Sequence, residues 1–445
     1  MKGYLSSVFK TVRKRNPQEP LFLQAVHEVL ASLEPVLAEH PEIEETAILE
    51  RLTEPERQII FRVAWQDDNG DIQVNRGYRL GFSSALGPYK GGLRFHPSVD
   101  LGTIKFLAFE QIFKNSLTGL SIGGGKGGAD FDPKGKSDCE IMRFCQAFMS
   151  ELFRYVGFQT DVPAGDIGVG SREIGYLFGQ YKKLTNRFEP GVLTGKEPGL
   201  GGSLGRKEAT GFGTVYFAAE MLKTRNQKIE GKTCLVSGSG NVALYCIRKL
   251  NDLGARVVAC SDSSGVAYDP DGIDFDILKA VKEIERLRIS EYVKRRPRAE
   301  FRPDARIWEI PCDMAFPCAT QNELNQKDAE ALAGHKCQLV AEGANMPSTP
   351  DAIEVFRKAG MLYGPAKAAN AGGVAVSALE MRQNASQEQW TFRTVDQQLK
   401  KIMASIHNDC ARVALRYHRK EDYAFGANVA GFLRVAEAVK AYGVV

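Results

Sequence analysis

The amino-acid sequence predicts an α/β protein of two domains, and three observations lead to this expectation. The chain has 445 residues, 43% of them hydrophobic and 25% charged, which is enough for more than one globular core. In the second half, short apolar runs alternate with helical patterns, as in a parallel sheet covered by helices. Glycines gather at residues 191–205 with little apolar periodicity, and we place a domain boundary there.

The first half of the chain contains helical and strand patterns in succession. Apolar residues at helical spacing predict helices over 19–40, 101–117 and 140–156. Residues 59–65 and 72–80 alternate in polarity on either side of a turn at 67–70, and this pattern predicts a β-hairpin.

Three glycine-rich segments separate these elements and are predicted to be loops, over 87–96, 119–130 and 161–170. They carry Lys90, Lys126 and Asp166, respectively. Because glycine has no Cβ, the five glycines around Lys126 should leave room beside its amine. A phosphate-binding P-loop is excluded, since Leu120 and Gly127 occupy the positions where it needs glycine and Ser/Thr.

Polar residues on the helix at 101–117 lie between two of these loops. Gln111 and Lys114 are three residues apart and therefore share one helix face. We hypothesise that Lys90, Lys114 and Lys126 converge on one pocket, where one amine with a lowered pKa acts as a base and the others hold carboxylates. Asp166 would carry protons opposite Lys126.

A dinucleotide-binding pattern begins after residue 231. An apolar strand, a G-x-G-x-x-A turn at 238–243, a helix reaching about Leu253 and a second strand at 256–260 follow in order. Asp262 lies 22 residues after Gly240, the distance at which a Rossmann unit places the residue that contacts the ribose. The sequence therefore predicts a Rossmann-like domain, with further strands at 313–316, 338–341 and 361–363 and closing helices at 395–416 and 426–442.

Composition excludes several classes of protein. The net charge of +4 and the lack of a basic run with aromatics give no support for nucleic-acid binding. Nine scattered cysteines without a C-x-x-C pair indicate buried free thiols, and neither a metal site nor a disulfide framework. No signal peptide and no apolar run of membrane-spanning length occur, so we expect a cytoplasmic protein.

Taken together, four ordered motifs resemble the small hexameric glutamate dehydrogenases, specifically the NADP-type branch of the Glu/Leu/Phe/Val dehydrogenase family. The motifs are GPYKGGLR at 87–94, GGGKGG at 123–128, PAGDIG at 163–168 and GSGNVA at 238–243. The resemblance covers essentially the whole chain. It implies reversible oxidative deamination of L-glutamate to 2-oxoglutarate and ammonium with NADP, within amino-acid metabolism and nitrogen assimilation.

The resemblance also implies an architecture and roles for individual residues. The first domain, 1–200, would bind substrate and oligomerise; the second, 201–421, would bind the dinucleotide; the helix at 422–445 would return to the first domain. A cleft would separate the domains, and the assembly would be a homohexamer. Lys126 would activate water and Asp166 would move protons. Substrate contacts would come from Lys90, Gln111, Lys114, Ser377 and Val374. Cofactor contacts would come from Arg206, Thr210, Gly238, Ser239, Gly240, Asn241, Val242, Asp262, Ser263 and Asn345.

Two residues depart from the family pattern. Ser263 is placed to bond a 2′-phosphate, but Glu285 stands where this branch often has a lysine, so NAD or dual use remains an alternative. Lys207 follows Arg206 where the family usually has proline. Two other functions also remain open: a dehydrogenase of branched or aromatic amino acids, against which Lys90 and Ser377 argue, and a catalytically silent nucleotide-binding protein.

Overall fold

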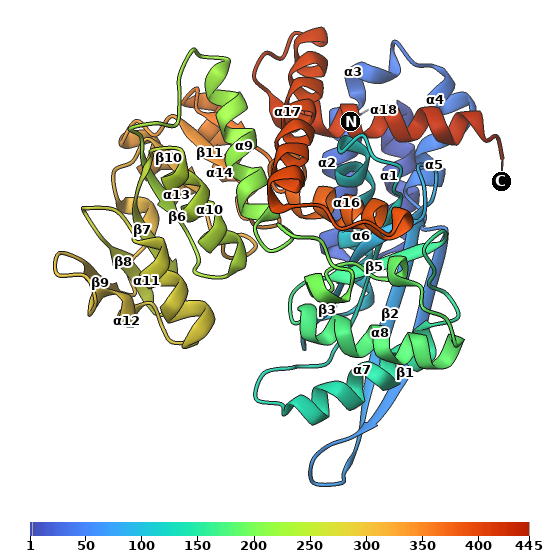
Figure 1. The fold of residues 1–445 in the computed structure, drawn as a ribbon. Helices are drawn as coiled ribbons and strands as arrows, with labels where there is room; N and C mark the ends of the chain where they lie inside the picture. Colours follow the sequence, from blue (N-terminus) through green and yellow to red (C-terminus); the bar gives the residue numbers. More distant parts are fainter. Residues whose placement is uncertain (2, 445) are drawn as a thin grey trace. The chain divides into compact units, whose positions relative to one another are not determined.

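The computed structural model describes residues 1 and 3–444, and the chain divides into two compact units. Unit 1 comprises residues 1–204, 376–395 and 428–445, and unit 2 comprises 205–375 and 396–427. The segment 376–395 belongs to unit 1, although the sequence placed it within the second domain, because its helix bonds to residues 195–203 of unit 1. The α/β fold class with two sheets is confirmed (Figure 1).

Unit 1 is built on a five-stranded mixed sheet in the order β1-β2-β4-β3-β5. Its strands are β1 Arg57–Gln66, β2 Ile72–Ser83, β3 Tyr89–Phe95, β4 Gly124–Ala129 and β5 Asp161–Gly165. Its helices are α1 Gly3–Arg15, α2 Pro20–Ser32, α3 Glu34–Leu37, α4 Glu42–Glu45, α5 Ile48–Leu52, α6 Leu101–Leu117, α7 Asp138–Leu152 and α8 Ser171–Thr185, followed by the 3₁₀ turns η1 Pro190–Val192 and η2 Pro198–Leu200. The helix expected over 19–40 is interrupted after Ser32, and Pro35 at the start of α3 explains the break, since proline cannot continue a helical hydrogen-bond ladder.

Helices cover the sheet of unit 1 on both faces. On one face Phe22 of α2, Phe82 of β2 and Phe109 of α6 form an aromatic cluster with edge and tilted contacts. On the other, Phe95 of β3 packs against Phe144 of α7 in a core that also includes residues of α8. The sheet is therefore buried on both sides at β3, β4 and most of β5, whereas β1 and the first half of β2 carry exposed side chains.

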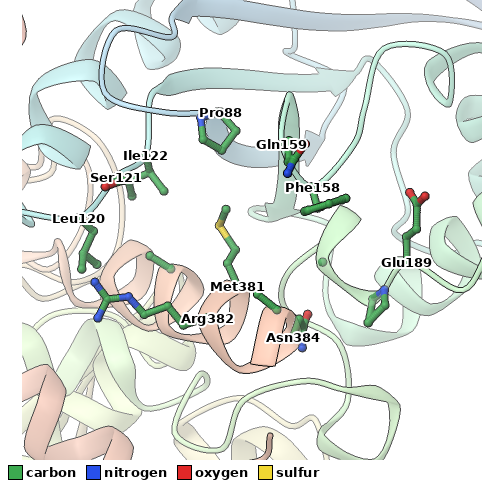
Figure 2. Close-up of a pocket in the computed structure, with 14 residues that line it drawn as sticks. Pro88, Leu120, Ser121, Ile122, Phe158, Gln159, Glu189, Met381, Arg382 and Asn384 are labelled. Carbon is green, nitrogen blue, oxygen red and sulfur yellow. The ribbon is translucent and has the colours of Figure 1, made fainter. Parts of the chain in front are cut away.

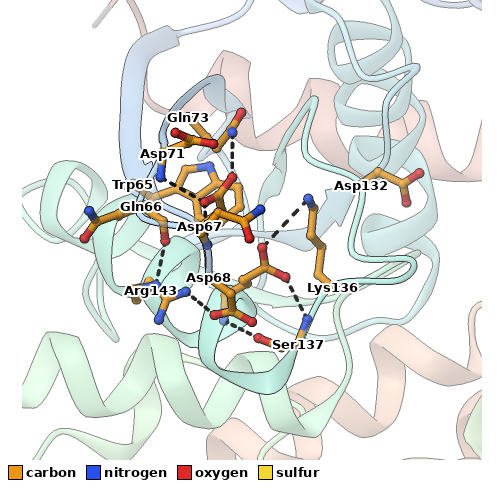
Figure 3. Close-up of polar contacts among 12 residues, drawn as sticks. Trp65, Gln66, Asp67, Asp68, Asp71, Gln73, Asp132, Lys136, Ser137 and Arg143 are labelled. Carbon is orange, nitrogen blue, oxygen red and sulfur yellow. Dashed lines mark hydrogen bonds and ion pairs between the residues drawn. The ribbon is translucent and has the colours of Figure 1, made fainter.

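The predicted hairpin is present as β1 and β2, and its turn is held by one carboxylate (Figure 3). Asp67 accepts hydrogen bonds from the backbone N–H of Asn69 (2.9 Å) and of Asp71 (3.0 Å). Arg143 of α7 donates to the carbonyl of Gln66 at 2.6 Å. The end of the hairpin is thereby tied to the helix that covers its base.

The expectation that the three glycine-rich segments are loops is wrong for residues 89–95, 124–129 and 161–165, which form the strands β3, β4 and β5, and it holds for the rest, including Asp166. A Cβ on Gly91 would lie 1.6 Å from the carbonyl oxygen of Gly125, and one on Gly124 would lie 2.8 Å from the Cα of Ile112 in α6. These glycines permit close approach of backbone to backbone. The side chain of Lys126 is correspondingly packed, with 6% of its surface exposed.

Unit 2 is built on a seven-stranded sheet in the order β12-β11-β10-β6-β7-β8-β9. Its strands are β6 Thr233–Val236, β7 Arg256–Asp262, β8 Gly265–Tyr268, β9 Glu300–Pro303, β10 Met314–Phe316, β11 Leu339–Ala341 and β12 Leu362–Gly364. The pairs from β12 to β7 are parallel, whereas β8 and β9 pair antiparallel at the edge. The chain order reverses between β6 and β10, as in a Rossmann-like sheet.

The helices of unit 2 follow its strands in sequence. They are α9 Ala209–Lys223, α10 Asn241–Asp252, α11 Phe275–Lys279, the π-helical turn η3 Ala280–Ile284, α12 Ser290–Val293, η4 Ile307–Glu309, α13 Gln326–Gly334, α14 Pro350–Lys358 and α15 Ala366–Ala369. Three helices have residues in both units: α16 Gly372–Ser386, α17 Phe392–Arg416 and α18 Tyr423–Ala441. In the described part of the chain, no helix combines the length and apolarity that crossing a bilayer requires.

All nine cysteines are free thiols in the described chain, but Cys139 is exposed, so the expectation of buried thiols holds for the other eight.

Candidate active site

The centre of the predicted substrate site is an ion pair that spans β3, the strand between β4 and β5 in the sheet of unit 1. Lys126 lies in β4, and Asp166 follows the last residue of β5. Their Nζ and Oδ2 atoms are 2.8 Å apart. Arg94 of β3 donates from Nε to the same Oδ2 at 3.0 Å. A Cβ on Gly92 would come within 2.8 Å of the Cβ of Asp166, so the lack of a side chain at this position makes room for the carboxylate.

Burial and neighbouring charges shift both pKa values. Burial lowers the pKa of the Lys126 amine below its ordinary value, the Asp166 carboxylate opposes this, and Arg94 and Arg79 add to the lowering. Burial alone would raise the pKa of Asp166, but Lys126 and Arg94 hold it below its usual range. The carboxylate is therefore ionised beside an amine that releases its proton more readily than an ordinary lysine.

A second, fully buried ion pair lies close to the first. Arg79 of β2 donates from Nε to Asp161 Oδ2 at 2.8 Å and from Nη1 to the carbonyl of Gly91 at 3.1 Å. The side chains of Arg79 and Asp161 are 0% and 5% exposed. Since β2 and β5 are not adjacent in the sheet, this contact spans the strands between them and fixes their alignment.

Two oxygen atoms hold the side-chain amine of Lys90, in β3, in one direction. Its Nζ donates to the carbonyl of Val162 at 3.0 Å and to Oγ1 of Thr194 at 2.8 Å. The residue is 1% exposed. An amine so deeply buried is held in one direction and contributes charge at a fixed point.

Helix α6 places two further predicted residues near these strands. Gln111 donates from Nε2 to Oδ1 of Asn115 at 2.5 Å, and Asn115 donates to the carbonyl of Lys90 at 3.0 Å. Lys114 follows Gln111 on the same helix and is half-buried. A continuous set of hydrogen bonds therefore connects the polar side of α6 to the strand that carries Lys90.

In unit 2, the predicted cofactor residues surround the turn between β6 and α10. Gly238 has a φ of +82°, which only glycine adopts without strain, and its N–H donates to Oγ of Ser261 at 2.9 Å. Gly240 is the N-cap of α10, and no side chain caps this helix end. A Cβ on Gly240 would meet nothing within 4 Å, so the first N–H groups of the helix face open space. Such an end suits a pyrophosphate.

Polar side chains gather at the end of β7, where the sequence predicts the contact to the ribose. Asp262 accepts from the N–H of Ser264 at 2.8 Å and from the N–H of Ile289 at 3.2 Å, and its side chain is 8% exposed. Ser263 accepts from Nη1 of Arg288 at 2.7 Å, and Lys282 lies 3.9 Å from Asp262. The carboxylate is thus engaged by the chain itself, while Ser263 and Arg288 are both exposed.

Comparison with known proteins agrees with this arrangement. Residues 201–443 match the model of the glutamate/leucine/phenylalanine/valine dehydrogenases, and residues 55–183 match the dimerisation domain of the same enzymes. The chain belongs to this dehydrogenase family.

Individual members of the family are similar over nearly the whole chain. An NADP-specific glutamate dehydrogenase of Helicobacter pylori is 57% identical over 99% of this chain and 100% of its own length. An NAD(P)-specific glutamate dehydrogenase of Xylanibacter ruminicola is 54% identical over 99% of both chains. The crystal structure of Plasmodium falciparum glutamate dehydrogenase matches with a TM-score of 0.97 at 55% identity, covering 99% of this chain and 95% of that one. The family resemblance seen in the sequence is confirmed.

Within this family framework, the remaining predicted residues divide between the units. Ser377 is buried in the part of α16 that belongs to unit 1, and Val374 precedes it in the part that belongs to unit 2. Arg206 and Thr210 lie at the start of unit 2, and Asn345 follows β11 and accepts from the side chain of Asn370 at 3.1 Å. Lys207 supplies a backbone carbonyl to Asn241 at 2.8 Å, a role that does not depend on its side chain. The site roles and the convergence of the three lysines stay predictions.

Four residues of this network were not identified from the sequence as site residues. Arg94 stands within the GPYKGGLR motif but was given no role, and Arg79 stands in a strand whose alternation draws attention to its apolar neighbours. Asp161 and Thr194 are separated from Arg79 and Lys90 by 82 and 104 residues. No local pattern links residues so far apart, and only the fold of the sheet brings them together.

A cavity of about 550 Å³ lies in unit 1 beside α16 (Figure 2). Its wall includes Pro88, Phe158, Ala378, Met381 and Arg382. Pro88 and Ala378 are close in the chain to Lys90 and Ser377, but none of the predicted site residues lines the cavity.

Proposed function

We propose that this protein is an NADP-dependent glutamate dehydrogenase, which interconverts L-glutamate with 2-oxoglutarate and ammonium. Family membership and end-to-end similarity to relatives named NADP-specific glutamate dehydrogenase support the proposal. The observation that carries the chemistry is the buried contact between Lys126 and Asp166, a base and a proton carrier within hydrogen-bond distance.

Recognition of glutamate requires positive or polar groups at both carboxylates. We assign the α-carboxylate to Lys114 and Gln111 of α6, which share one helix face. We assign the distal carboxylate to Lys90 and Ser377, both 1% exposed, and apolar contact to Val374. The Lys90 amine and the Ser377 hydroxyl favour a dicarboxylate, because they can bind its second carboxylate, whereas the apolar side chains of leucine and phenylalanine offer them no acceptor.

The chemistry at the amino-bearing carbon follows from the pKa shifts. When bound, NADP⁺ supplies the acceptor for the hydride that leaves the substrate Cα. Lys126 takes a proton from the attacking water, because its lowered pKa favours the neutral amine. While Lys126 is neutral, the main charge that lowers the pKa of Asp166 is absent, so Asp166 takes a proton from the substrate ammonium group. Once Lys126 is protonated, the pKa of Asp166 falls again and it returns that proton to the departing nitrogen. Arg94 keeps Asp166 in place throughout.

The groups at the end of β7 favour NADP over NAD. A ribose 2′-hydroxyl would be read by a free carboxylate, but Asp262 already accepts hydrogen bonds from Ser264 and Ile289. A 2′-phosphate would instead bind Ser263 and Arg288, with Lys282 nearby. Glu285 does not oppose this, since Arg295 binds its carboxylate bidentately at 2.7 and 2.6 Å.

The protein is expected to act as an oligomer. The family's dimerisation domain matches residues 55–183, and we propose a homohexamer of cytoplasmic location, as the resemblance implies. Mass photometry of the purified protein tests the assembly, and a species other than six copies would contradict it.

Initial rates test the proposed activity. The purified protein is assayed with L-glutamate or L-leucine, each with NADP⁺ and with NAD⁺. We expect kcat/KM for glutamate with NADP⁺ to exceed the other three combinations by at least about 100-fold. Preference for leucine would indicate a dehydrogenase of apolar amino acids, preference for NAD⁺ would overturn the cofactor assignment, and no turnover in either direction would indicate a silent nucleotide-binding protein.

A further inference from the structure

Three residues on one side of α16 hold the segment at 193–204 in unit 1. Glu380 accepts from the N–H of Gly195 at 2.9 Å and from Nζ of Lys196 at 2.8 Å. Gln383 donates to Oγ of Ser203 at 2.8 Å, and Asn384 donates to the carbonyl of Gly201 at 2.6 Å. The segment is therefore bound to the helix along its length.

The Lys196–Glu380 ion pair is the most deeply buried of these contacts. The two side chains are 1% and 0% exposed. Lys196 also donates to Oδ1 of Asn384 at 3.0 Å and to the carbonyl of Leu193, so its three donors have partners. Burial lowers the pKa of the Lys196 amine, and the Glu380 charge opposes this change.

A gain in the stability of the folded protein does not by itself explain why an ion pair is buried here. Removing two charges from water costs several kcal/mol per ion, and replacing a buried pair by apolar residues of similar size is often neutral or stabilising. What a buried pair provides is one defined geometry. Two neighbouring groups, Thr194 and Ser377, depend on the geometry of this pair.

Thr194 stands between the ion pair and Lys90. Its hydroxyl accepts from Lys90 at 2.8 Å, and its N–H donates to the carbonyl of Pro163 in β5 at 3.0 Å. The residues on either side, Leu193 and Gly195, each bond to a member of the ion pair. Thr194 can move relative to Lys90 only if these contacts change.

On the helix side, Ser377 precedes Glu380 by three residues and shares its face of α16. Glu380 thus fixes the helix that carries Ser377 to the loop that carries the partner of Lys90. The ion pair sets the position of both proposed contacts to the distal carboxylate, although it is itself neither of them.

We propose that Lys196 and Glu380 are positioning residues that determine the preference for substrates with a distal carboxylate, by holding Thr194, and through it Lys90, in register with Ser377. This inference rests on the proposed glutamate dehydrogenase activity and extends it to residues outside the expected site.

The first experiment separates positioning from general damage. Glu380→Gln removes the charge and one of the two acceptors. L-norvaline serves as the probe substrate because it has the same α-amino acid group but an apolar end. We expect the KM for L-glutamate to rise about tenfold, with kcat, the KM for NADP⁺ and norvaline turnover each changed by less than about threefold. A merely structural role would lower turnover of both substrates together, and that result would overturn the proposal.

A double variant guards against misfolding from an unpaired buried charge. Lys196→Met with Glu380→Met removes both charges at similar volume and should fold. We expect its glutamate-to-norvaline ratio of kcat/KM to stay about tenfold below that of the unaltered protein. If the glutamate-to-norvaline ratio of the double variant equals that of the unaltered protein, each charge of the pair serves only to neutralise the other. The proposal is then wrong.

The chain offers a matched control in the same unit. Lys105 and Glu19 form another Lys–Glu pair, buried at the lysine and partly buried at the glutamate, with Nζ and Oε2 2.8 Å apart and side chains 6% and 16% exposed. Lys105→Met with Glu19→Met should leave the glutamate-to-norvaline ratio within about twofold. An equal loss of the ratio in this control would show that any buried pair has the effect.

A double-mutant cycle tests the route through Thr194. Thr194→Val removes the acceptor of Lys90 at nearly constant volume. If Glu380 acts through Thr194, combining Thr194→Val with Glu380→Gln should raise the KM for glutamate no more than the larger single change. Multiplicative effects would mean that Glu380 acts by another route.

These outcomes are separable from those that test the function. If the unaltered protein does not turn over glutamate, the proposed function fails. If it does, and Glu380→Gln retains both the KM and the discrimination, only the positioning role fails.

Discussion

The two sheets differ in where they place charged side chains. In unit 1 the strands themselves carry buried charges: Arg79 in β2, Lys90 in β3, Lys126 in β4 and Asp161 in β5. In unit 2 the strands β6, β10, β11 and β12 contain no charged residue, and the buried carboxylates Asp269 and Glu342 come directly after strands.

Glycine explains how the strands of unit 1 can carry buried charged side chains. Gly91 and Gly125 let adjacent backbones approach closely, so long cationic side chains are buried within a crowded sheet that also has large aromatic residues. Unit 2 instead presents backbone N–H groups at the start of α10 and places its charges at strand ends. Side chains inside a sheet suit a small dicarboxylate, whereas backbone groups and strand ends suit a dinucleotide.

The largest expected effect concerns Lys126, the proposed base of unit 1. Lys126→Ala should reduce glutamate turnover by roughly 10³–10⁴-fold, because it removes the base that takes a proton from water. NADP binding, followed by fluorescence titration, should be unchanged because its residues lie in unit 2. The exposed Lys134→Ala, eight residues further along, should keep full activity. Retained turnover in Lys126→Ala would show that the amine is not the base.

The next effect concerns stability and compares buried with exposed ion pairs. Arg79→Met leaves the Asp161 carboxyl group without its partner inside the sheet, and should lower the free energy of unfolding by about 3–4 kcal/mol. Arg298→Met, in an exposed pair with Asp271 in unit 2, should cost less than about 1 kcal/mol. Urea unfolding of the two variants measures both values. Equal losses would mean that burial of the Arg79 pair has no energetic consequence.

Glu342 gives unit 2 a pH dependence of another origin, since burial is the largest cause of its pKa shift. Burial raises its pKa to about 7 from an ordinary value of 4.5. The folded state therefore binds a proton between pH 4.5 and 7 that the unfolded chain has already lost. Its contribution to stability is full below pH 4.5 and is lost as the pH rises to about 7.

Glu342→Gln should abolish this dependence, because an amide imitates the neutral carboxyl group. Between pH 5 and pH 8 the unaltered protein should lose roughly 2–3 kcal/mol of unfolding free energy relative to the variant. The exposed Glu330→Gln should show no such difference. A difference that is absent or grows toward acid would contradict the raised pKa of Glu342.

The difference between the two units also determines how much of the fold and of the site could be predicted from the sequence. The dinucleotide turn at 238–243, the helix α10 and Asp262 are close in the chain, so spacing alone located them. The helix α6 was predicted with its observed bounds, Leu101–Leu117, because its apolar periodicity is local. Features that depend on residues far apart in the chain were harder to predict. The segments that form β3, β4 and β5 were taken for loops, because glycine lowers strand propensity. The close backbone approach that glycine permits depends on strands and helices far away in the sequence.

The substrate region illustrates the limit most clearly. Lys126 and Asp166 were named by their glycine-rich surroundings and by family resemblance, and the fold places them in contact. Glu380 and Lys196 were not named, because they are separated by 184 residues and neither stands in a recognisable pattern. A buried ion pair of this kind is visible only once the fold is known.

The smallest predicted effect concerns cofactor choice in unit 2, where charges are exposed and screened. Arg288→Gln removes the donor that bonds Ser263, and should raise the KM for NADP⁺ about tenfold while changing the KM for NAD⁺ by less than about twofold. Glu285→Gln, at the position where a lysine was expected, should change the KM for NADP⁺ by no more than about twofold. Its carboxylate is already bound by Arg295, and an exposed charge contributes little at physiological salt. Initial rates at 0.15 M salt measure both. If Glu285→Gln lowered the KM for NADP⁺ tenfold, its carboxylate would be repelling the 2′-phosphate, and Arg295 would not be the partner that neutralises it.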